Sequence, residues 1–287
     1  MERLKQFFIC LALLFLLSAQ EMCRAYTPTS VITARPHDDT AIYFTPQDFP
    51  ITSDGRTDVS DALQEALNKT KEKENDCGIL FIPEGTYQLS KTIYVPSGVR
   101  IIGYGNKRPV FVLAKQSPGF QEVTRETSKV KYIFWFIGGN YRPGGRIGDA
   151  NAGTFYSSMI NIDIRIEDGN PNATGIRAHF AQHCSISHVT IHAGKGRAGI
   201  ADPGNHLDNV AVYGGEYGID TDKSAPGWPI MLLNSYFEGQ RKSAILTQEG
   251  GLTIVRMHAK NVPVAIEIKE NAPDRLFMED CIFENVS

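Results

Sequence analysis

The second half of the chain repeats a short strand pattern at a nearly constant interval. An apolar–polar–apolar hexapeptide begins at each of six anchors, and the steps between them are 27, 21, 25, 22 and 23 residues. The anchors are Met159, Ile186, Leu207, Leu232, Ile254 and Phe277. Periods of ~20–30 residues that hold several short strands are typical of solenoids, in which each repeat stacks on the next. The pattern therefore predicts a parallel β-solenoid.

A second pattern, interleaved with the first, places a small residue before isoleucine once in each repeat. The steps between these pairs are 24, 19, 26 and 21 residues. The pairs begin at Gly175, Gly199, Gly218, Ala244 and Ala265. Two alternating patterns predict several strands in each coil. Within the first pattern, His188, Asn209 and Asn234 share one position and Asn161 lies close to it, which predicts a polar ladder along the coils.

A helix is predicted ahead of the repeats, over residues 59–71. Its apolar residues fall on one helical face, at Val59, Leu63, Ala66 and Leu67. Thr57 or Asp58 can cap its first turn. Because the end of a solenoid exposes unpaired strand edges and an open apolar core, we expect this helix to cover the N-terminal end. Strands are then expected at residues 78–83, 86–89, 92–95 and 99–103.

The first 25 residues have the features of a secretory signal peptide. Two basic residues precede an apolar run over residues 7–17, which is too short to span a bilayer as a stable helix. Small residues follow, and cleavage after Ala25 or near Ala19 is expected; an uncleaved anchor is the alternative. We therefore expect a signal peptide at residues 1–25, a β-helix at 26–287, and a secreted or periplasmic protein that is not attached to a membrane after cleavage.

Charge and cysteine content narrow the classes of partner. The net charge of −3 argues against a nucleic-acid partner, which would require a basic face. Three cysteines remain outside the signal, and their spacing does not resemble a metal-binding knuckle, so we expect no metal, no cofactor and no disulfide framework. Cys184 and Cys281 fall in or beside repeat strands and are expected to be buried thiols, and Cys77 is the third.

The entry into the repeats resembles that of a known superfamily. It reads DGRTDVSDALQEAL, then GILFIPEGTYQLSKTIYVPSGVRIIGYG. This is similar to the start of the pectate-lyase-like right-handed parallel β-helices, which include rhamnogalacturonase- and epimerase-like domains. The resemblance covers residues 45–287 and implies an all-β right-handed parallel β-helix with an N-terminal capping helix. The stretch FAQHCSI and the small-residue–Ile steps resemble most the N-terminal half of a family 55 exo-β-1,3-glucanase.

The resemblance selects two adjacent candidate site residues. In family 55 enzymes, a Gln in the corresponding segment helps to hold the attacking water, and Gln182 is the matching position. His183 departs from the small residue expected beside it and is a candidate for substrate binding. Two turn residues are further candidates for substrate binding, because a tryptophan can stack on a sugar ring and an arginine can donate hydrogen bonds. They are Trp228, alternatively a loop anchor, and Arg241.

Three carboxylates are candidates for catalysis. Coils stack ~4.8 Å apart, so carboxylates on neighbouring coils can reach the separations of glycosidase pairs, ~5–5.5 Å or ~6.5–9.5 Å. The candidates are Asp202, Asp222 and Glu238, and a solvated coil edge is the alternative interpretation of each. Glu238 shares a register with His192 and Lys260, which indicates an outward-facing column.

These observations favour a secreted carbohydrate-active protein whose partner is a polysaccharide. One hypothesis is a glycoside hydrolase of β-glucan type, or the N-terminal half of one, acting by general acid/base catalysis. A pectin-type lyase is a weaker variant, because no acidic calcium cluster accompanies Arg177, Arg256 or Lys260. The other hypothesis is a non-catalytic glycan-binding module or a truncated product. It rests on the resemblance, since family 55 enzymes draw their general acid from a second β-helix and the repeats here stop within a coil.

Overall fold

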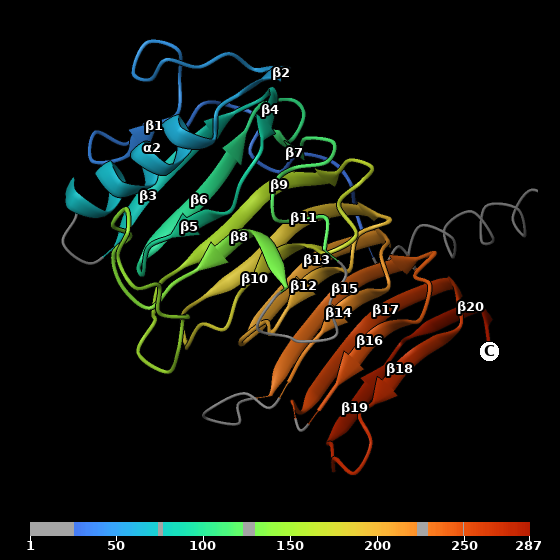
Figure 1. The fold of residues 1–287 in the computed structure, drawn as a ribbon. Coiled ribbons are helices and arrows are strands. Elements are labelled where there is room, and N and C mark those ends of the chain that lie inside the picture. The colour runs from blue at the N-terminus through green and yellow to red at the C-terminus, as the bar shows by residue number, and fades with distance from the viewer. Residues whose placement is uncertain (1–25, 74–76, 123–129, 223–228, 249) are drawn as a thin grey trace, which may run out of the picture.

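The chain forms a parallel β-solenoid of about 8 turns, with a short helix near its N-terminal end (Figure 1). The computed structural model describes residues 26–73, 77–122, 130–222, 229–248 and 250–287. The predicted signal peptide at residues 1–25 lies outside this range. The predicted fold class, a parallel β-helix with an N-terminal helix, is confirmed. Within the described ranges, no helix is long and apolar enough to cross a membrane.

The strands begin close to the predicted residues. Those of the N-terminal third are β1 (Ile42–Tyr43), β2 (Asp54–Asp58), β3 (Gly78–Pro83), β4 (Thr86–Leu89), β5 (Ile93–Val95), β6 (Val99–Tyr104), β7 (Val110–Leu113) and β8 (Lys131–Phe136). The repeats contain β9 (Ser158–Ile166), β10 (Ala173–Arg177), β11 (Ser185–Gly194), β12 (Ala198–Ala201), β13 (His206–Gly214) and β14 (Tyr217–Asp220). The last coils contain β15 (Ile230–Glu238), β16 (Ser243–Thr247), β17 (Leu252–Val262), β18 (Val264–Ile268), β19 (Leu276–Glu279) and β20 (Ile282–Val286).

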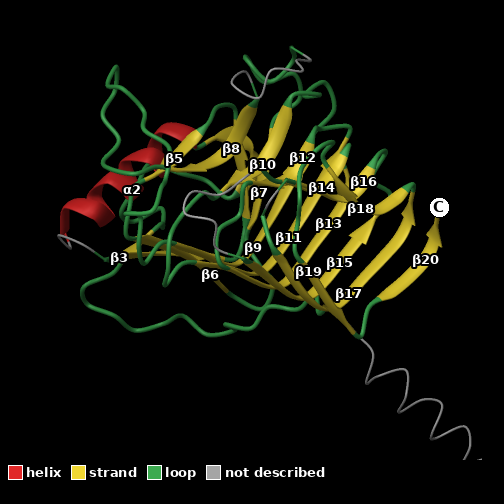
Figure 2. Ribbon diagram, turned by 90° about the horizontal axis from the view of Figure 1, so that it is seen from below, coloured by secondary structure: helices red, strands yellow, loops and turns green. Residues whose placement is uncertain are grey.

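Two parallel sheets enclose the core, and the larger one is folded along its length (Figure 2). The smaller sheet has 7 strands in the order β18-β16-β14-β12-β10-β8-β5. The larger has 13 strands, and its long members bend in the middle. The first half of β9 pairs with β6 and its second half pairs with β7. A complete coil therefore has three sides.

One residue in each long strand, and Asp280 between β19 and β20 in the last coil, lies at this bend and adopts the left-handed conformation. The column has φ values between +49° and +60°. Its members are Asn161, His188, Asn209, Asn234, Arg256 and Asp280. Asparagine is the non-glycine residue that tolerates this conformation best, because its short polar side chain bonds locally. The predicted polar ladder is confirmed, and Asn161 belongs to the same register as the other members.

The first predicted pattern holds through five of its six anchors. Met159, Ile186, Leu207, Leu232 and Ile254 pair in a continuous row. In the last coil, however, Ile254 pairs with Met278 and not with Phe277. A shift of one residue turns every side chain to the opposite face of a strand. Phe277 is accordingly 55% exposed, whereas Met278 packs against the core, so the anchor predicted at Phe277 was wrong by one residue.

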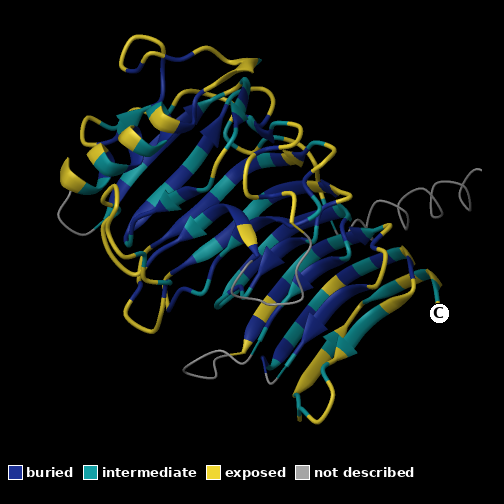
Figure 3. Ribbon diagram, viewed as in Figure 1, coloured by how far each residue is buried: buried dark blue, intermediate teal, exposed yellow. Residues whose placement is uncertain are grey.

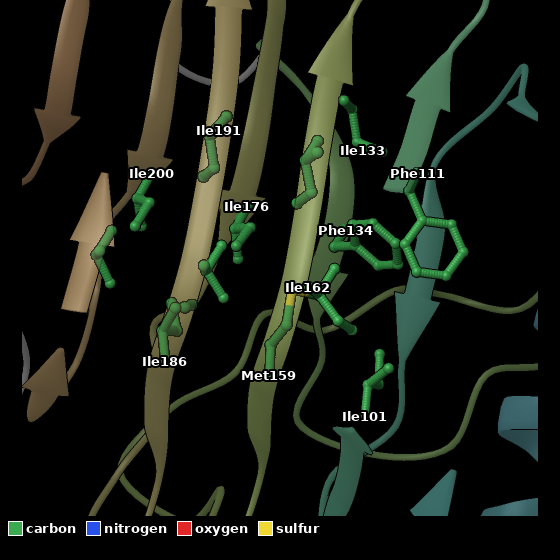
Figure 4. Close-up of a cluster of buried hydrophobic side chains, with 14 of the residues drawn as sticks. Ile101, Phe111, Ile133, Phe134, Met159, Ile162, Ile176, Ile186, Ile191 and Ile200 are labelled. Carbon is green, nitrogen blue, oxygen red and sulfur yellow. The ribbon is translucent and has the colours of Figure 1, made fainter. Parts of the chain in front are cut away.

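The second predicted pattern holds throughout and forms one wall of the core. Its isoleucines pair in sequence at Ile176, Ile200, Ile219, Ile245 and Ile266. Figure 4 shows Ile176 and Ile200 gathered with Ile186, Ile191 and Met159 from the opposing sheet. The strands are buried along most of the solenoid and become exposed toward β18–β20 (Figure 3). Cys184 is buried, as predicted, but Cys281 in the last coil is only half-buried; both thiols and that of Cys77 are free.

The helix α2 (Ser60–Lys73) covers the first coils. Leu63, Ala66 and Leu67 lie on the inner face of this helix and are fully buried, as the helical periodicity predicted. The Asp58 carboxylate accepts a hydrogen bond from the Ser60 backbone N–H at 2.9 Å. Asp58 therefore caps the first turn of the helix. The position of the helix over the first coils confirms the prediction that it covers the N-terminal end of the solenoid.

Residues 26–32 form a strap that crosses the outside of the bend. The Asn209 side-chain amide accepts a hydrogen bond from the Thr27 N–H at 2.6 Å and donates one to the Thr27 carbonyl at 2.8 Å. Asn161 accepts in the same way from the Val31 N–H at 3.0 Å. The buried Arg108 guanidinium donates to the carbonyls of Thr27 and Thr29 at 2.8 and 3.0 Å. The polar ladder thus holds the strap against several coils at once.

We expect Gly218→Ala to lower the free energy of unfolding by about 2 kcal/mol, as overpacking of a core does. A Cβ at this position would lie 2.4 Å from Phe237 Cδ1 and 2.5 Å from the Ala244 carbonyl oxygen. The measurement is equilibrium unfolding in urea. Gly148→Ala is the matched control, since nothing lies within 4 Å of its Cβ, and it should change stability by less than about 0.5 kcal/mol. Equal effects of the two variants would contradict this packing.

Candidate functional site

A polar groove of about 350 Å³ lies on the outer face of the 7-stranded sheet. Side chains from β5, β8, β10, β12 and β14 line it, so each coil contributes one level. Its charged lining residues are Lys131, Asp149, Arg177, Arg197, Asp202, Asp220 and Asp222. Tyr94, Tyr132 and Trp135 add aromatic surface.

The register of the strands explains why these side chains gather. Ile176 and its partners point into the core, and the next residue of each strand points outward. Outward positions therefore form a column of paired residues, which runs Tyr94, Trp135, Arg177, Ala201 and Asp220. Ala201 is the only small side chain in this column. It leaves space in the coil of β12, next to Asp202, which follows it in the sequence.

Arg177 occupies the centre of the groove and binds two carboxylates. Its Nη2 lies 2.6 Å from Asp149 Oδ2, and its Nη1 lies 2.5 Å from Asp202 Oδ2. The Trp135 indole N–H donates to Asp149 Oδ1 at 2.7 Å. His179 Nδ1 lies 3.5 Å from Asp149 Oδ2. The Arg177 side chain is only 18% exposed, so these charge-assisted hydrogen bonds are partly shielded from water.

The environment of Asp149 shifts two pKa values in opposite directions. Burial works to raise the pKa of Asp149, but hydrogen bonds from His179, Arg177 and Trp135 outweigh it and lower the pKa to about 2. The hydrogen bond to Asp149 in turn raises the pKa of His179, against the effect of burial. Asp149 is therefore an anion that holds Arg177 and Trp135 in place, and it is not suited to donate a proton.

Two of the predicted catalytic carboxylates meet in the groove. Asp202 Oδ1 accepts a hydrogen bond from the Asp222 backbone N–H at 2.6 Å, which fixes the two residues beside each other. The Asp222 carboxylate pairs with Lys269 and its side chain is 49% exposed, whereas that of Asp202 is 15% exposed. Asp220 lies between them in sequence and pairs with Arg197 at 2.7 Å. Asp222 is therefore the carboxylate most open to a ligand.

The other predicted site residues lie elsewhere. Gln182 and His183 occupy an exposed turn between β10 and β11, where His183 stacks on Tyr156 with ring centroids 5.2 Å apart. Glu238 belongs to β15 and faces outward from the 13-stranded sheet, where Tyr236 donates to it at 2.8 Å. Arg241 lies in the turn between β15 and β16 and donates to the carbonyls of Gly194, Lys195 and Gly196 in the turn two coils before it. Trp228 falls outside the described residues.

Two groove residues that the sequence did not single out are Trp135 and Asp149. Arg177 was considered only as a lyase base without acidic neighbours, and its contacts with Asp149 and Asp202 correct that interpretation. Trp135 and Arg177 hold the outward position directly after an inward-facing residue, and this position was a usable signal. Asp149 comes from the connection between β8 and β9, for which the repeat gives no register. Within the parts of the chain that the structure describes, no group of three or more His, Cys, Asp or Glu side chains is arranged to hold a metal ion.

The fold and its outward groove define a pectate-lyase-like parallel β-helix protein. The sequence model of the family described as "Rhamnogalacturonase A/epimerase, pectate lyase-like" matches residues 45–283. The chain therefore belongs to this family, and the superfamily resemblance found in the sequence is confirmed. The finer resemblance to family 55 glucanases stays a prediction. A search of curated proteins finds no match.

Solved structures share the fold at low sequence identity. The catalytic domain of a family 87 α-1,3-glucanase in complex with nigerose has a TM-score of 0.51 and 13% identity, covering 88% of this chain and 41% of its own length. The ι-carrageenase of A. fortis has a TM-score of 0.49 and 17% identity, covering 83% and 56%. The surface adhesin PfbA of Streptococcus pneumoniae has a TM-score of 0.45 and 12% identity, covering 82% and 65%. At these identities the likeness shows the fold alone.

We expect Arg177→Met to lower the free energy of unfolding by about 3 kcal/mol, because it leaves the charges of Asp149 and Asp202 without their partner in a partly buried site. Equilibrium denaturation measures the loss. Arg165→Met is the control, since its ion pair with Glu167 is 49% exposed on the arginine side and should cost less than about 1 kcal/mol. A loss at Arg177 no larger than at Arg165 would show that the network does not stabilise the fold.

Stability should fall as the pH rises through the pKa of His179. That pKa is raised above its ordinary value, so the stabilising contribution is fully present below pH ~6.5 and disappears as the folded imidazolium loses its proton. Thermal unfolding of the wild type and of His179→Gln between pH 5 and 9 measures this. The difference between the two midpoints should shrink with rising pH. His37→Gln changes a side chain that is 91% exposed and is the matched control. A constant difference for His179→Gln would refute the prediction.

Proposed function

We propose that this chain binds a neutral polysaccharide in the groove and hydrolyses its glycosidic bonds. The observation that carries the proposal is that aromatic rings and paired carboxylates from successive coils line the same groove. Sugar rings stack on aromatic faces, and their hydroxyls donate to carboxylates. Membership in a family described by rhamnogalacturonase A and epimerases supports a carbohydrate ligand. Export by the predicted signal peptide at residues 1–25 would bring the protein to such a polymer outside the cell.

The charges of the groove favour a neutral glycan over an anionic one. Four carboxylates line it, those of Asp149, Asp202, Asp220 and Asp222, against the three cations of Lys131, Arg177 and Arg197. The difference, 3 − 4, gives a net charge of −1. Both arginines are already paired with carboxylates. Lys269, which pairs with Asp220 and Asp222 from outside the lining, brings the balance to zero, so a polyuronate or sulfated chain would find no surplus of positive charge to bind it. A pectin-type lyase is accordingly the less favoured assignment.

Hydrolysis of a glycosidic bond needs one carboxylic acid and one carboxylate. We assign the carboxylate role to Asp202, because the Arg177 guanidinium lies 2.5 Å from it and holds it within the groove. This group would accept a proton from the attacking water. We assign the acid role to Asp222, whose greater exposure lets it reach the oxygen of the leaving sugar. This role requires the bound glycan to displace Lys269, which pairs with the Asp222 carboxylate in this structure. Trp135, fixed by Asp149, lies two coils from the level of Asp202, or ~10 Å, and would support a sugar ring further along the chain.

A second candidate function is glycan binding without hydrolysis. The observation that favours it is that the carboxylates of the groove all face cations. Arg177 pairs with Asp149 and Asp202, Arg197 with Asp220, and Lys269 with Asp222. Such pairs are typical of a structural network as well as of an active site. Release of new reducing ends separates the two functions, because binding alone produces none.

We expect Asp202→Asn and Asp222→Asn each to reduce the release of reducing sugar from laminarin about 100-fold or more, because each removes an acid/base group. Binding of laminarin, measured by affinity electrophoresis, should persist in both. Glu72→Gln changes an exposed carboxylate on α2 and serves as the control. Binding by the wild type without any reducing-sugar release would favour the second candidate. Undiminished rates in both Asp variants would refute the assigned roles, and a failure to bind any neutral polysaccharide would refute the function.

Gln182→Ala discriminates between the family 55 resemblance and the groove. The resemblance implies that Gln182 holds the attacking water, so its loss should abolish hydrolysis. Gln182 does not line the groove and its turn is exposed, so the geometry predicts a rate within about two-fold of the wild type. The rate of reducing-sugar release decides the matter. An inactive Gln182→Ala protein with a wild-type melting temperature would move the site from the groove to this turn.

A further inference from the structure

The groove continues beyond its carboxylates toward the capping helix. A second hollow of about 260 Å³ lies between the N-terminal part of α2 and the 7-stranded sheet. It shares Thr92, Tyr94 and Lys131 with the first, so the two hollows adjoin each other. Its further lining includes Gln64 from α2 and Tyr141 from the connection after β8. The wall of this second hollow is thus built from elements that lie outside the repeats.

Two parallel tyrosine rings form the wall of the second hollow. The ring centroids of Tyr94 and Tyr141 lie 4.9 Å apart with an interplanar angle of 9°. Tyr94 also contacts Trp135, with ring centroids 5.8 Å apart. Both tyrosines are half-buried, so they keep surface for a ligand. The aromatic wall of the groove therefore runs without a break from Trp135 to Tyr141.

The helix holds Tyr94 by its backbone. Tyr94 belongs to β5, the edge strand of the 7-stranded sheet. The Gln64 side-chain amide donates to the Tyr94 carbonyl at 2.8 Å and accepts from the Tyr94 N–H at 2.8 Å. These two bonds replace the neighbouring strand that an edge residue lacks. Gln64 is therefore a positioning residue, because it fixes the peptide unit from which the Tyr94 ring projects.

We propose that Tyr94 and Tyr141 form a remote sugar-binding subsite, which Gln64 positions, and that it makes the protein select long neutral glycan chains. The proposal rests on the proposed function of the groove. Tyr94 lies three coils from Asp202, along β5, β8, β10 and β12, which corresponds to ~14 Å. A ligand that reaches both must span several sugar units, so it lies along the solenoid axis. A disaccharide bound at the carboxylates does not reach the tyrosines.

The test compares the affinities of a long and a short oligosaccharide by calorimetry. Asp222→Asn is the background, so that the ligand is not consumed. The probes are the hexasaccharides and disaccharides of the β-1,3-glucan, β-1,4-glucan, β-1,4-mannan and β-1,4-xylan series. We expect Tyr141→Ala to weaken hexasaccharide binding about ten-fold, as the loss of one stacked ring does, and to leave disaccharide binding unchanged. Phe155→Ala removes an aromatic ring that is 38% exposed and does not line either hollow, and it is the control.

Gln64→Ala should lower the ratio of hexasaccharide to disaccharide affinity as Tyr141→Ala does. A merely structural role of Gln64 would lower both affinities together and leave the ratio unchanged. Equal hexasaccharide affinity of the background protein and Tyr141→Ala would overturn the subsite and leave the groove intact. Failure of the background protein to bind any probe would overturn the proposed function and the subsite with it.

Discussion

Parallel hydrogen bonding between successive coils sets the spacing on which the rest of the structure depends. It repeats each side chain ~4.8 Å along the axis, so a property of one coil becomes a column over many. The inward columns contain Ile176, Ile200 and Ile219, and they build the core. The outward columns contain Trp135, Arg177 and Asp220, and they build the groove. Core and groove therefore share one register, and a slip of one residue would exchange them.

Side-chain amides complete the backbone hydrogen bonding where the coils cannot. Asn209 satisfies both the N–H and the carbonyl of Thr27 in the strap, and Asn161 accepts from Val31. In the same way, the Gln64 side-chain amide bonds both the N–H and the carbonyl of Tyr94 at the edge of the sheet. Unpaired backbone groups at a sheet edge can pair with other chains. These amides satisfy backbone groups of the strap and of β5, which have no neighbouring strand to bond them. In the second case the same bonds also fix an aromatic ring, so protection of the edge and construction of the proposed subsite have one cause.

The sequence predicted the parts of the molecule that repeat. The isoleucine row, the polar ladder and the capping helix were all visible because each recurs, or has its own periodicity. The last anchor was misplaced because Leu276, Phe277 and Met278 are apolar in succession, and no alternation marks the inward one.

The groove was only half visible in the sequence. Asp202 and Asp222 could be selected because they follow ladder steps, but Asp149 lies in a connection without a register. Glu238 was correctly read as outward-facing. The sequence could not predict on which side of the solenoid Glu238 lies, because that depends on the bend that Asn161 and its partners make in the long strands.

The central claim is that the groove beside Trp135 is where a glycan binds. The chain has two tryptophans, so Trp228→Phe leaves Trp135 as the single fluorescent indole. Titration of this variant with neutral hexasaccharides should give a saturable change in emission, with the same dissociation constant that calorimetry gives. Polygalacturonate should give none at comparable concentrations. Saturable binding by calorimetry with no change in the Trp135 emission would contradict the account, because the glycan would then bind at another face of the solenoid.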